Sequence, residues 1–471
     1  MPPDVVLGLD AGTTSAKAVL VDRDGAIVAE AASDPIETRS PEPGAAEQDA
    51  EAVWRALGQA SRRAIAEVRA EQRPVAVAIA AQSGSVAPVE PGDRIGRPFI
   101  TWMDARSRSL VESWGRDAHD SIRAISGWSP SPGLGLSTIA WLRASGAREA
   151  ARFASVDDYL IHRLTGEWVT NPSNAAGMQL MDVSGLEWSN ELCAMAAVDV
   201  SRLSSIRPSA ARLGPIDPQA AVETGLLDAA VMVGGHDQAC AALALGVVDP
   251  GHLMISAGTA WVLTATVDHG EVERLAASLN LSPHVVPRRW SASRNLGGVG
   301  ALLEWWRHEC GATHEQLEAD LASGPIEQSD PAFVPAMTDV DRTAWGHFSP
   351  GAAGHSRASL TRAVFEAAAF EVRAALEEMT EPHTRVSLVG GSAASSRLAQ
   401  TLADVTGLEV DVRAGASWPA RGAAMLAARG LGWPAVEWTP GGGGLHPDPI
   451  AAARHAPRYD VYRRLGGGTR S

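Results

Sequence analysis

Apolar and polar positions alternate at the start of the chain in the manner of a β-meander. Val5 to Leu9 is an apolar run typical of a buried strand, and Asp10 to Thr14 follows it as a turn. Residues 16–21 form a second apolar run, and the Asp-Arg-Asp-Gly turn at 22–25 leads into a third run over 26–32. The pattern therefore predicts three consecutive strands joined by tight turns.

The same analysis predicts alternating helices and strands along the rest of the chain. Apolar side chains at helical spacing predict a helix within 47–69, and short apolar runs predict strands at 75–80 and 229–234. Further elements are expected as helices at 236–245, 360–379, 395–406 and 421–428, as strands at 386–389 and 409–412, and as a closing helix that contains Tyr459, Tyr462 and Leu465. This order of elements is typical of an α/β protein.

A second strand–turn–strand unit occurs near the middle of the chain. Residues 252–255 and 260–266 are apolar runs on either side of Ser256-Ala257-Gly258-Thr259. The tripeptide Ala-Gly-Thr therefore stands twice, at 11–13 and at 257–259, each time between two apolar runs. The shared context indicates a duplicated domain.

Composition narrows the class of protein. The 471 residues are 45% hydrophobic and 20% charged, which is typical of a globular chain. The net charge of −15 argues against nucleic acid or an anionic membrane as a partner. No apolar run approaches the roughly 20 residues that cross a bilayer, and the first residues lack the features of a signal peptide. The three scattered cysteines indicate neither disulfides nor a cysteine metal site, so we expect a cytoplasmic protein.

The first turn has the chemistry of a phosphate loop. Gly12 allows a sharp turn with close approach to a ligand, and Thr13 and Thr14 supply N–H and hydroxyl donors. Asp10 offers the hard oxygen that Mg²⁺ prefers. An ordinary hairpin explains this turn equally well when it is taken alone. The second turn at 256–259 favours the phosphate interpretation, because two donor-rich turns could hold a triphosphate from both sides.

Other segments supply candidate groups for acceptor and nucleotide. Asp237 follows Gly234-Gly235-His236 and could accept the proton of an attacking hydroxyl as a general base, although capping the following helix is the alternative. Trp102, Asp104 and Arg106 combine a flat ring with two charges, as sugar sites do, although 15 tryptophans make coincidence a rival. Gly390-Gly391-Ser392 after a strand is a third place where backbone could approach a nucleotide.

Together, these blocks resemble the FGGY family of carbohydrate kinases, and through it the actin-like ATPase fold. The resemblance rests on seven blocks in the family's order: Leu9 to Lys17, Trp102 to Arg106, Asp158 to Gly166, Gly234 to Gln238, Ser256 to Thr259, Arg357 to Phe370 and Gly390 to Ser392. Lys17, the only lysine among 40 basic residues, holds the family's usual basic position in the first block.

The resemblance implies a fold and a reaction. It implies two RNase H-like α/β domains with the active site in a cleft between them, at 1–249 and 250–435, followed by a linker and tail at 436–471. The reaction is transfer of the γ-phosphate of ATP, with Mg²⁺, to a hydroxyl of a small sugar or polyol. We expect Asp237 to be catalytic and Asp10 to hold the metal. The expected sugar ligands are Gln82, Ser83, Trp102, Asp104, Arg106, His236 and Gln238. The expected nucleotide ligands are Asp10, Gly12, Thr13, Thr14, Lys17, Gly258, Thr259, Gly300, Gly390, Gly391, Ser392 and Ser395.

Departures from the family pattern bear on the substrate. Thr138 stands where a lysine usually precedes the tryptophan at 141, and Ser417-Trp418-Pro419 replaces a stretch that often carries an acid. Gln82 is followed by Ser83-Gly84, whereas glycerol kinases carry Arg-Glu and xylulokinases usually Met-His. A pentulose such as xylulose is the leading expectation. Another ketose, a deoxy sugar, an aldonate or a tetritol stays open, as do a non-catalytic sugar-binding regulator, an actin-like ATPase and a homodimeric assembly.

Overall fold

The computed structural model describes residues 4–69, 72–146, 150–275, 279–336, 345–379, 382–415, 417–434 and 443–466. The chain divides into two compact units, each assembled from separate segments. Unit 1 comprises residues 1–248, 267–292 and 417–440, and unit 2 comprises residues 249–266, 293–416 and 441–471. The sequence-based boundaries at 249 and 435 stay predictions.

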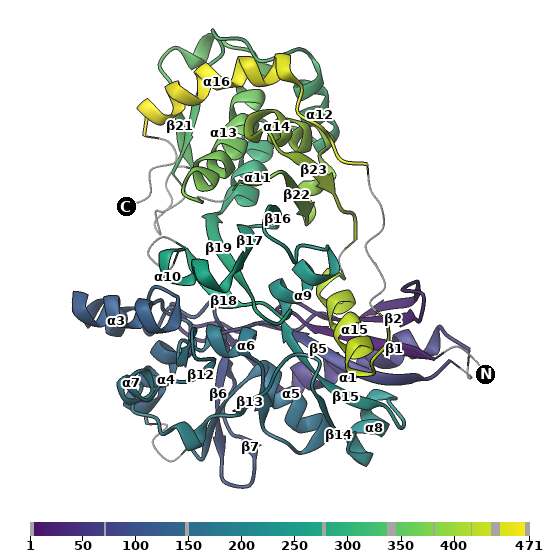
Figure 1. Cartoon of the computed structure of the whole chain (residues 1–471). Helices are drawn as coiled ribbons and strands as arrows, with labels where there is room; N and C mark the ends of the chain where they lie inside the picture. Colours follow the sequence, from purple (N-terminus) through teal and green to yellow (C-terminus); the bar gives the residue numbers. More distant parts are fainter. Residues whose placement is uncertain are drawn as a thin grey trace. The chain divides into compact units, whose positions relative to one another are not determined.

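Unit 1 is built on a six-stranded sheet with the order β14-β15-β5-β1-β2-β3 (Figure 1). Strands β1 (Val5–Ala11), β2 (Ala16–Asp22) and β3 (Ile27–Ala32) form the antiparallel meander. Strand β1 also pairs in parallel with β5 (Pro74–Ala81), which pairs in parallel with β15 (Ala230–His236), and β14 (Arg212–Pro215) closes the edge antiparallel to β15. The carboxyl ends of β1, β5 and β15 therefore meet at one edge of this sheet.

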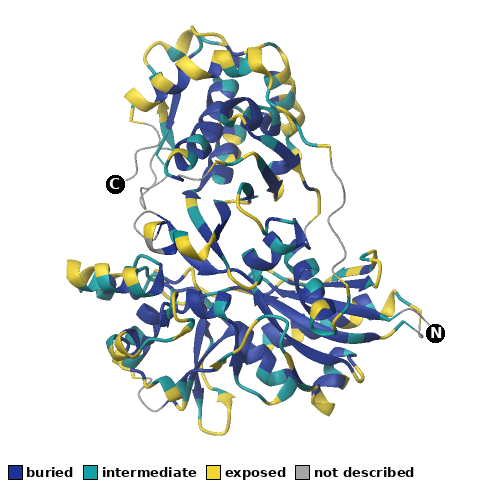
Figure 2. Ribbon diagram, in the orientation of Figure 1, coloured by how far each residue is buried: buried dark blue, intermediate teal, exposed yellow. Residues whose placement is uncertain are grey.

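Both faces of this sheet are covered, which explains why β1 is an uninterrupted apolar run rather than an alternating one. Every residue of β1 is buried (Figure 2). Val5, Leu7 and Leu9 share a core with helix α1 (Ala50–Ala66), whereas Val6 on the opposite face packs with helix α15 (Trp418–Gly430). Gly8 is needed between them, because a Cβ there would stand 1.8 Å from the carbonyl oxygen of Ala420.

A second six-stranded sheet repeats this strand order. It has the order β18-β19-β17-β16-β22-β23, in which β16 (His252–Ala257) pairs antiparallel with β17 (Trp261–Asp268) and in parallel with β22 (Arg385–Val389). Strand β22 pairs in parallel with β23 (Glu409–Val412), and the remaining strands are β18 (Asn280–Pro283) and β19 (Arg289–Gly297). The run β15-β5-β1-β2-β3 of the first sheet thus corresponds to β23-β22-β16-β17-β19 of the second. This equivalence supports the duplication predicted from the repeated tripeptide.

Four helices of unit 2 bear on the sites described below. They are α11 (Val299–Glu309), α12 (His314–Ala322), α13 (Arg357–Glu377) and α14 (Ser396–Thr406). Helix α16 (Pro449–Arg464) is the closing helix predicted from sequence. The predicted linker at 440–444 falls partly outside the described residues. Within the described ranges, no helix is long and apolar enough to cross a membrane.

Candidate active site

The hairpin of β1 and β2 carries a buried carboxylate at the start of the predicted phosphate loop. Asp10 belongs to β1, not to the turn, and stands opposite Lys17 of β2. Only 4% of Asp10 is exposed, and its Oδ1 atom has no hydrogen-bond partner. Burial and the nearby charge of Asp237 raise the pKa of Asp10 to about 7, while Lys17 acts in the opposite direction. The site therefore holds an acceptor oxygen that the protein itself leaves unsatisfied.

Asp237 opens helix α9 (Asp237–Ala244), directly after strand β15. Its carboxylate accepts the backbone N–H of Gln238 at 2.6 Å and lies 3.0 Å from Nε2 of His236. The N-cap position itself is His236, whose backbone N–H donates to Ser173 Oγ. About a fifth of the Asp237 side chain is exposed, so the carboxylate can reach a bound molecule. Gln238 adds a buried amide oxygen without a hydrogen-bond partner.

A chain of hydrogen bonds joins the phosphate loop to the segment around Trp102. Thr13 Oγ1 donates to Gln82 Oε1 at 3.1 Å and accepts from Trp102 Nε1 at 3.2 Å. Gln82 Nε2 donates to Gln48 Oε1, and Gln48 Nε2 donates to the carbonyl oxygen of Thr13 at 2.6 Å. Ser85 Oγ donates to Gln82 Oε1 and accepts from the backbone N–H of Trp102. Buried Gln82 is thus the centre of this network.

Asp104 and Arg106 are paired with protein groups. Asp104 is buried and accepts from the backbone N–H groups of Ala46 and Arg106 at 2.9 Å each. The Arg106 guanidinium contacts Asp104 and Glu47 at 2.8 and 2.7 Å. It also lies over the ring of Trp141, 4.5 Å from its centroid. The ring of Trp102, by contrast, is nearly half exposed, which leaves it available for stacking.

Unit 2 contains a cavity of about 810 Å³ beside the second hairpin turn. Six of the predicted nucleotide ligands line it: Gly258, Thr259, Gly300, Gly391, Ser392 and Ser395. Its apolar walls come from helices α11 to α14 and include Leu303, Leu317, Phe365 and Leu398. The backbone N–H groups near the hairpin turn suit a phosphate group, and the apolar walls suit an aromatic base.

Glycines shape this cavity by allowing close backbone contact. A Cβ on Gly300 would stand 2.0 Å from the carbonyl oxygen of Gly258. A Cβ on Gly390 would lie 2.7 Å from the carbonyl oxygen of Ala257, and Gly390 also has a φ of +102°. Gly390 thus supports the turn without lining the cavity. Side chains at these positions would displace the turn at 257–259.

Comparison with known proteins decides the family. The pattern of the FGGY family of carbohydrate kinases, N-terminal domain, matches residues 5–244, and that of the C-terminal domain matches residues 253–431. The chain belongs to the FGGY family of carbohydrate kinases. It is 28% identical to the xylulose kinase of Escherichia coli (strain K12) over 98% of both chains. It is 27% identical to the glycerol kinase of Saccharolobus islandicus (strain M.16.27), covering 92% of this chain and 89% of that one.

Solved structures confirm the predicted fold. The crystal structure of xylulose kinase from Rhodospirillum rubrum matches this FGGY kinase with a TM-score of 0.88 and 26% sequence identity, over 98% of each chain. The fold is therefore the actin-like ATPase fold expected from the sequence. The chain is an ATP-using carbohydrate kinase, an enzyme that phosphorylates an alcohol group of a small sugar or polyol.

The structure brings the predicted residues of this FGGY kinase together in two groups. In unit 1, Asp10 and Asp237 interact electrostatically, and Thr13, Gln82 and Trp102 share one hydrogen-bond network. Gly12 and Thr14 lie in the same hairpin turn, and Ser83 Oγ donates to the carbonyl oxygen of Asn174. The second group lines the cavity of unit 2. The individual ligand roles of all these residues stay predictions.

Sequence reasoning missed several members of both groups. Gln48 was not singled out, because an amide at the start of a helical segment looks like any surface residue. Asn174, which is buried with both side-chain amide atoms unpartnered, gave no motif signal either. The apolar walls of the cavity, such as Phe365 and Leu398, have the same spacing as ordinary core residues. Only the packing of their helices distinguishes them.

We predict that the buried charge of Asp10 makes this kinase less stable as pH rises. A carboxyl whose pKa is raised to about 7 binds its proton in the folded state between pH 4 and 7, where the unfolded state has lost it. Stability of the wild type then falls over this range and levels off above it. Asp10→Asn lacks this slope, so it gains relative to the wild type by at most about 4 kcal/mol.

Urea unfolding of the metal-free protein between pH 4.5 and 8 measures this effect, with the exposed turn residue Asp24 changed to Asn as the control. If the difference in unfolding free energy between Asp10→Asn and the wild type does not change with pH, burial does not raise the pKa of Asp10.

We predict that Gln82 positions the two substrates rather than binding the sugar alone. Gln82→Leu removes the acceptor of the Thr13 and Ser85 hydroxyl protons and the donor to Gln48 Oε1, and each unmade hydrogen bond at such a site costs about 1–3 kcal/mol. Because Thr13 belongs to the phosphate loop, KM for ATP should rise together with KM for the sugar, and kcat should fall.

Steady-state kinetics with each substrate varied in turn tests this, with Gln59→Leu as a matched control, since Gln59 makes its hydrogen bonds to Asp34 at the surface. A rise in the sugar KM alone would identify Gln82 as a sugar ligand instead.

Proposed function

We propose that this kinase phosphorylates a pentulose of the xylulose type. The full-length likeness to a xylulose kinase supports this substrate class. The segment after Gln82 argues against glycerol as the substrate. Glycerol kinases carry the charged pair Arg-Glu after this glutamine, whereas this chain has Ser83 and Gly84. Gly84 has a φ of +86°, which disfavours any larger residue at this position.

Asp237 is the general base in this proposal, and its position is the observation that carries it. Its partly exposed carboxylate opens helix α9 directly after strand β15, where it can accept a proton from a bound hydroxyl. It is close enough to buried Asp10 to raise the pKa of that group. The acceptor hydroxyl therefore meets its base beside the phosphate loop, as phosphoryl transfer requires.

Asp10 is the residue that would hold Mg²⁺. Its buried, unpartnered Oδ1 and its raised pKa both fit a site that a cation completes. Mg²⁺ commonly binds through one or two carboxylates together with substrate phosphates. When bound, the ion would neutralise charge on the transferring phosphate. The hydroxyl and N–H groups of Thr13 and Thr14 would position the phosphates in the same loop.

The sugar ligands follow from exposure and from unsatisfied polar atoms. The exposed ring of Trp102 offers a flat face to sugar C–H groups, and Thr13 fixes its indole N–H. Gln238 provides a buried acceptor oxygen that lacks a partner. Asp104 and Arg106 act by holding this segment in place, because their charged groups already pair with each other. The cavity of unit 2 is the adenosine site in this proposal.

The alternative substrates are another ketose, a deoxy sugar, an aldonate or a tetritol. The non-catalytic regulator is less well supported, since Asp10 and Asp237 are both in place. The actin-like ATPase is less well supported because the chain carries the blocks at 102–106 and 234–238. The cytoplasmic location and the homodimer stay predictions.

ADP release with Mg·ATP against a panel of about thirty ketoses, polyols, aldonates and deoxy sugars tests the substrate. We expect the strongest stimulation from a pentulose, and weak or no stimulation from glycerol. Preferred stimulation by an aldonate or a tetritol would reject the pentulose proposal but keep the kinase. A flat panel from a protein that binds ATP would favour the regulator.

We predict that Asp237→Ala lowers kcat by about 10²–10⁴-fold and leaves ATP binding within a few-fold of the wild type. The removed group acts on the acceptor hydroxyl, not on the nucleotide. Single-turnover kinetics and nucleotide titration together measure the two effects.

Asp217→Ala is the matched control, because Asp217 caps helix α8 (Pro218–Thr224) by accepting two backbone N–H groups. Loss of a cap costs about 1 kcal/mol of stability without affecting turnover. If both variants lose the same stability and keep normal turnover, Asp237 is merely a helix-terminal residue.

A further inference from the structure

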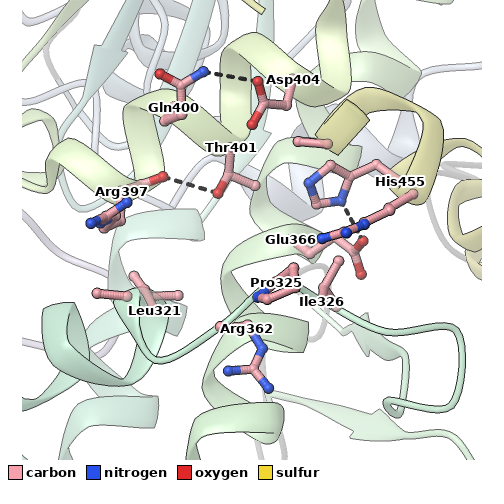
Figure 3. A pocket seen from close by; sticks show the side chains of 14 residues that line it. Leu321, Pro325, Ile326, Arg362, Glu366, Arg397, Gln400, Thr401, Asp404 and His455 are labelled. Carbon is pink, nitrogen blue, oxygen red and sulfur yellow. Dashed lines mark hydrogen bonds and ion pairs between the residues drawn. The ribbon is translucent and has the colours of Figure 1, made fainter. Parts of the chain in front are cut away.

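A second cavity lies in unit 2, and none of the predicted active-site residues lines it. Its volume is about 350 Å³, and Figure 3 shows it from close by. Four helices, α12, α13, α14 and α16, and the loop at 324–326 contribute to it. The polar residues that line it are Arg362, Glu366, Arg397, Gln400, Thr401, Asp404, Arg454 and His455.

The acidic groups of this cavity are already paired. Both oxygens of Glu366 contact the guanidinium of buried Arg458, and Glu366 Oε1 also lies 2.7 Å from Nδ1 of His455. Asp404 Oδ1 accepts from Gln400 Nε2 and from the backbone N–H of Asp448, at 2.8 and 2.7 Å. Figure 3 shows the dashed contacts of Glu366 with His455 and of Gln400 with Asp404. These carboxylates are therefore poor partners for further cations.

The basic groups are not paired to the same extent. Among the described residues, the guanidinium groups of Arg397 and Arg454 have no ion-pair or hydrogen-bond partner, although both residues line the cavity. Arg362 pairs with Asp330 and donates to Ser323 and Ser359, and only its buried Nε atom lacks a hydrogen-bond partner. His455 uses only Nδ1. The cavity thus has an excess of positive charge, on a chain whose net charge is −15.

The cavity shares three helices with the adenosine site. Helix α14 presents Leu398 and Ser395 to the adenosine cavity, and Arg397 and Thr401 to the second cavity. Helix α13 contributes Phe365 to the first and the adjacent Glu366 to the second. Helix α12 likewise lines both, with residues 314–318 in one and 321–322 in the other. A molecule that displaces these helices in one cavity would change the shape of the other.

We propose that this cavity is an effector site for a small phosphate-bearing metabolite, and that its occupancy changes the affinity of the enzyme for ATP. Arginine guanidinium groups bind phosphate through paired N–H donors, which a single lysine cannot provide. The volume fits a free phosphate or a sugar phosphate. The binding step stands on this cavity alone, whereas the coupling rests on the adenosine site of the proposed function.

Isothermal titration with inorganic phosphate and with D-ribose 5-phosphate tests the binding step. Saturating Mg·ADP keeps both probes out of the nucleotide site, and neutral D-ribose controls for the sugar moiety. We expect both phosphates to bind the wild type and Arg464→Glu, a charge reversal at an exposed position of α16 outside the cavity. The double change Arg397→Glu with Arg454→Glu should weaken binding at least tenfold. The double change to Gln, which removes both positive charges without reversing them, should also weaken it.

Two outcomes would overturn the site: no phosphate binding by the wild type, or equal binding by the wild type and both double variants. The coupling is tested by KM for ATP with and without the bound probe. It should change at least threefold in the wild type and in Arg464→Glu, and not in the double variants. An unchanged KM despite binding would reject the effector role. Because the titration needs no turnover, failure of the proposed substrate leaves the binding result intact.

Discussion

A carboxylate buried at the end of a central strand is the constraint on which this kinase depends. Asp10 sits in the fully buried strand β1, and Asp237 adds a second negative charge nearby. Lys17 opposes these effects only in part, because the pKa of Asp10 remains raised. Burial of Asp10 Oδ1 costs free energy, and no hydrogen bond to this atom offsets that cost. The folded state therefore keeps a buried acceptor oxygen without a hydrogen-bond partner, which is the feature that the proposed metal site uses.

The fold places that carboxylate through a general property of parallel sheets. Strands β1, β5 and β15 end at the same edge, so the segments after them converge although they are far apart in sequence. Asp10, Gln82 and Asp237 each lie at one of these three strand ends. The amide of Gln82 then links the phosphate loop to Trp102. Position along the strand, not local motif chemistry, brings these side chains together.

The second hairpin turn carries no buried charge, and backbone contacts shape its surroundings instead. This turn at 257–259 follows a strand equivalent to β1, but no acidic residue stands there. Instead, Gly300 and Gly390 let neighbouring backbone approach the turn closely enough to shape a cavity. The duplicated hairpins have thus diverged: one supplies a charged group, and the other supplies steric room beside apolar helices.

The sequence by itself determined the fold class, the family and the positions of both hairpin turns, because apolar runs, glycines and hydrogen-bonding residues are local signals. It also singled out Asp10 and Asp237, whose roles stay predictions. Only the tertiary structure showed that Arg106 pairs with Asp104 and that Gln48 donates a hydrogen bond to the carbonyl oxygen of Thr13. It also showed that Phe365 and Leu398 line a cavity. These roles depend on contacts between segments distant in the chain. Burial, pKa and pairing are properties of such contacts, which no single segment contains.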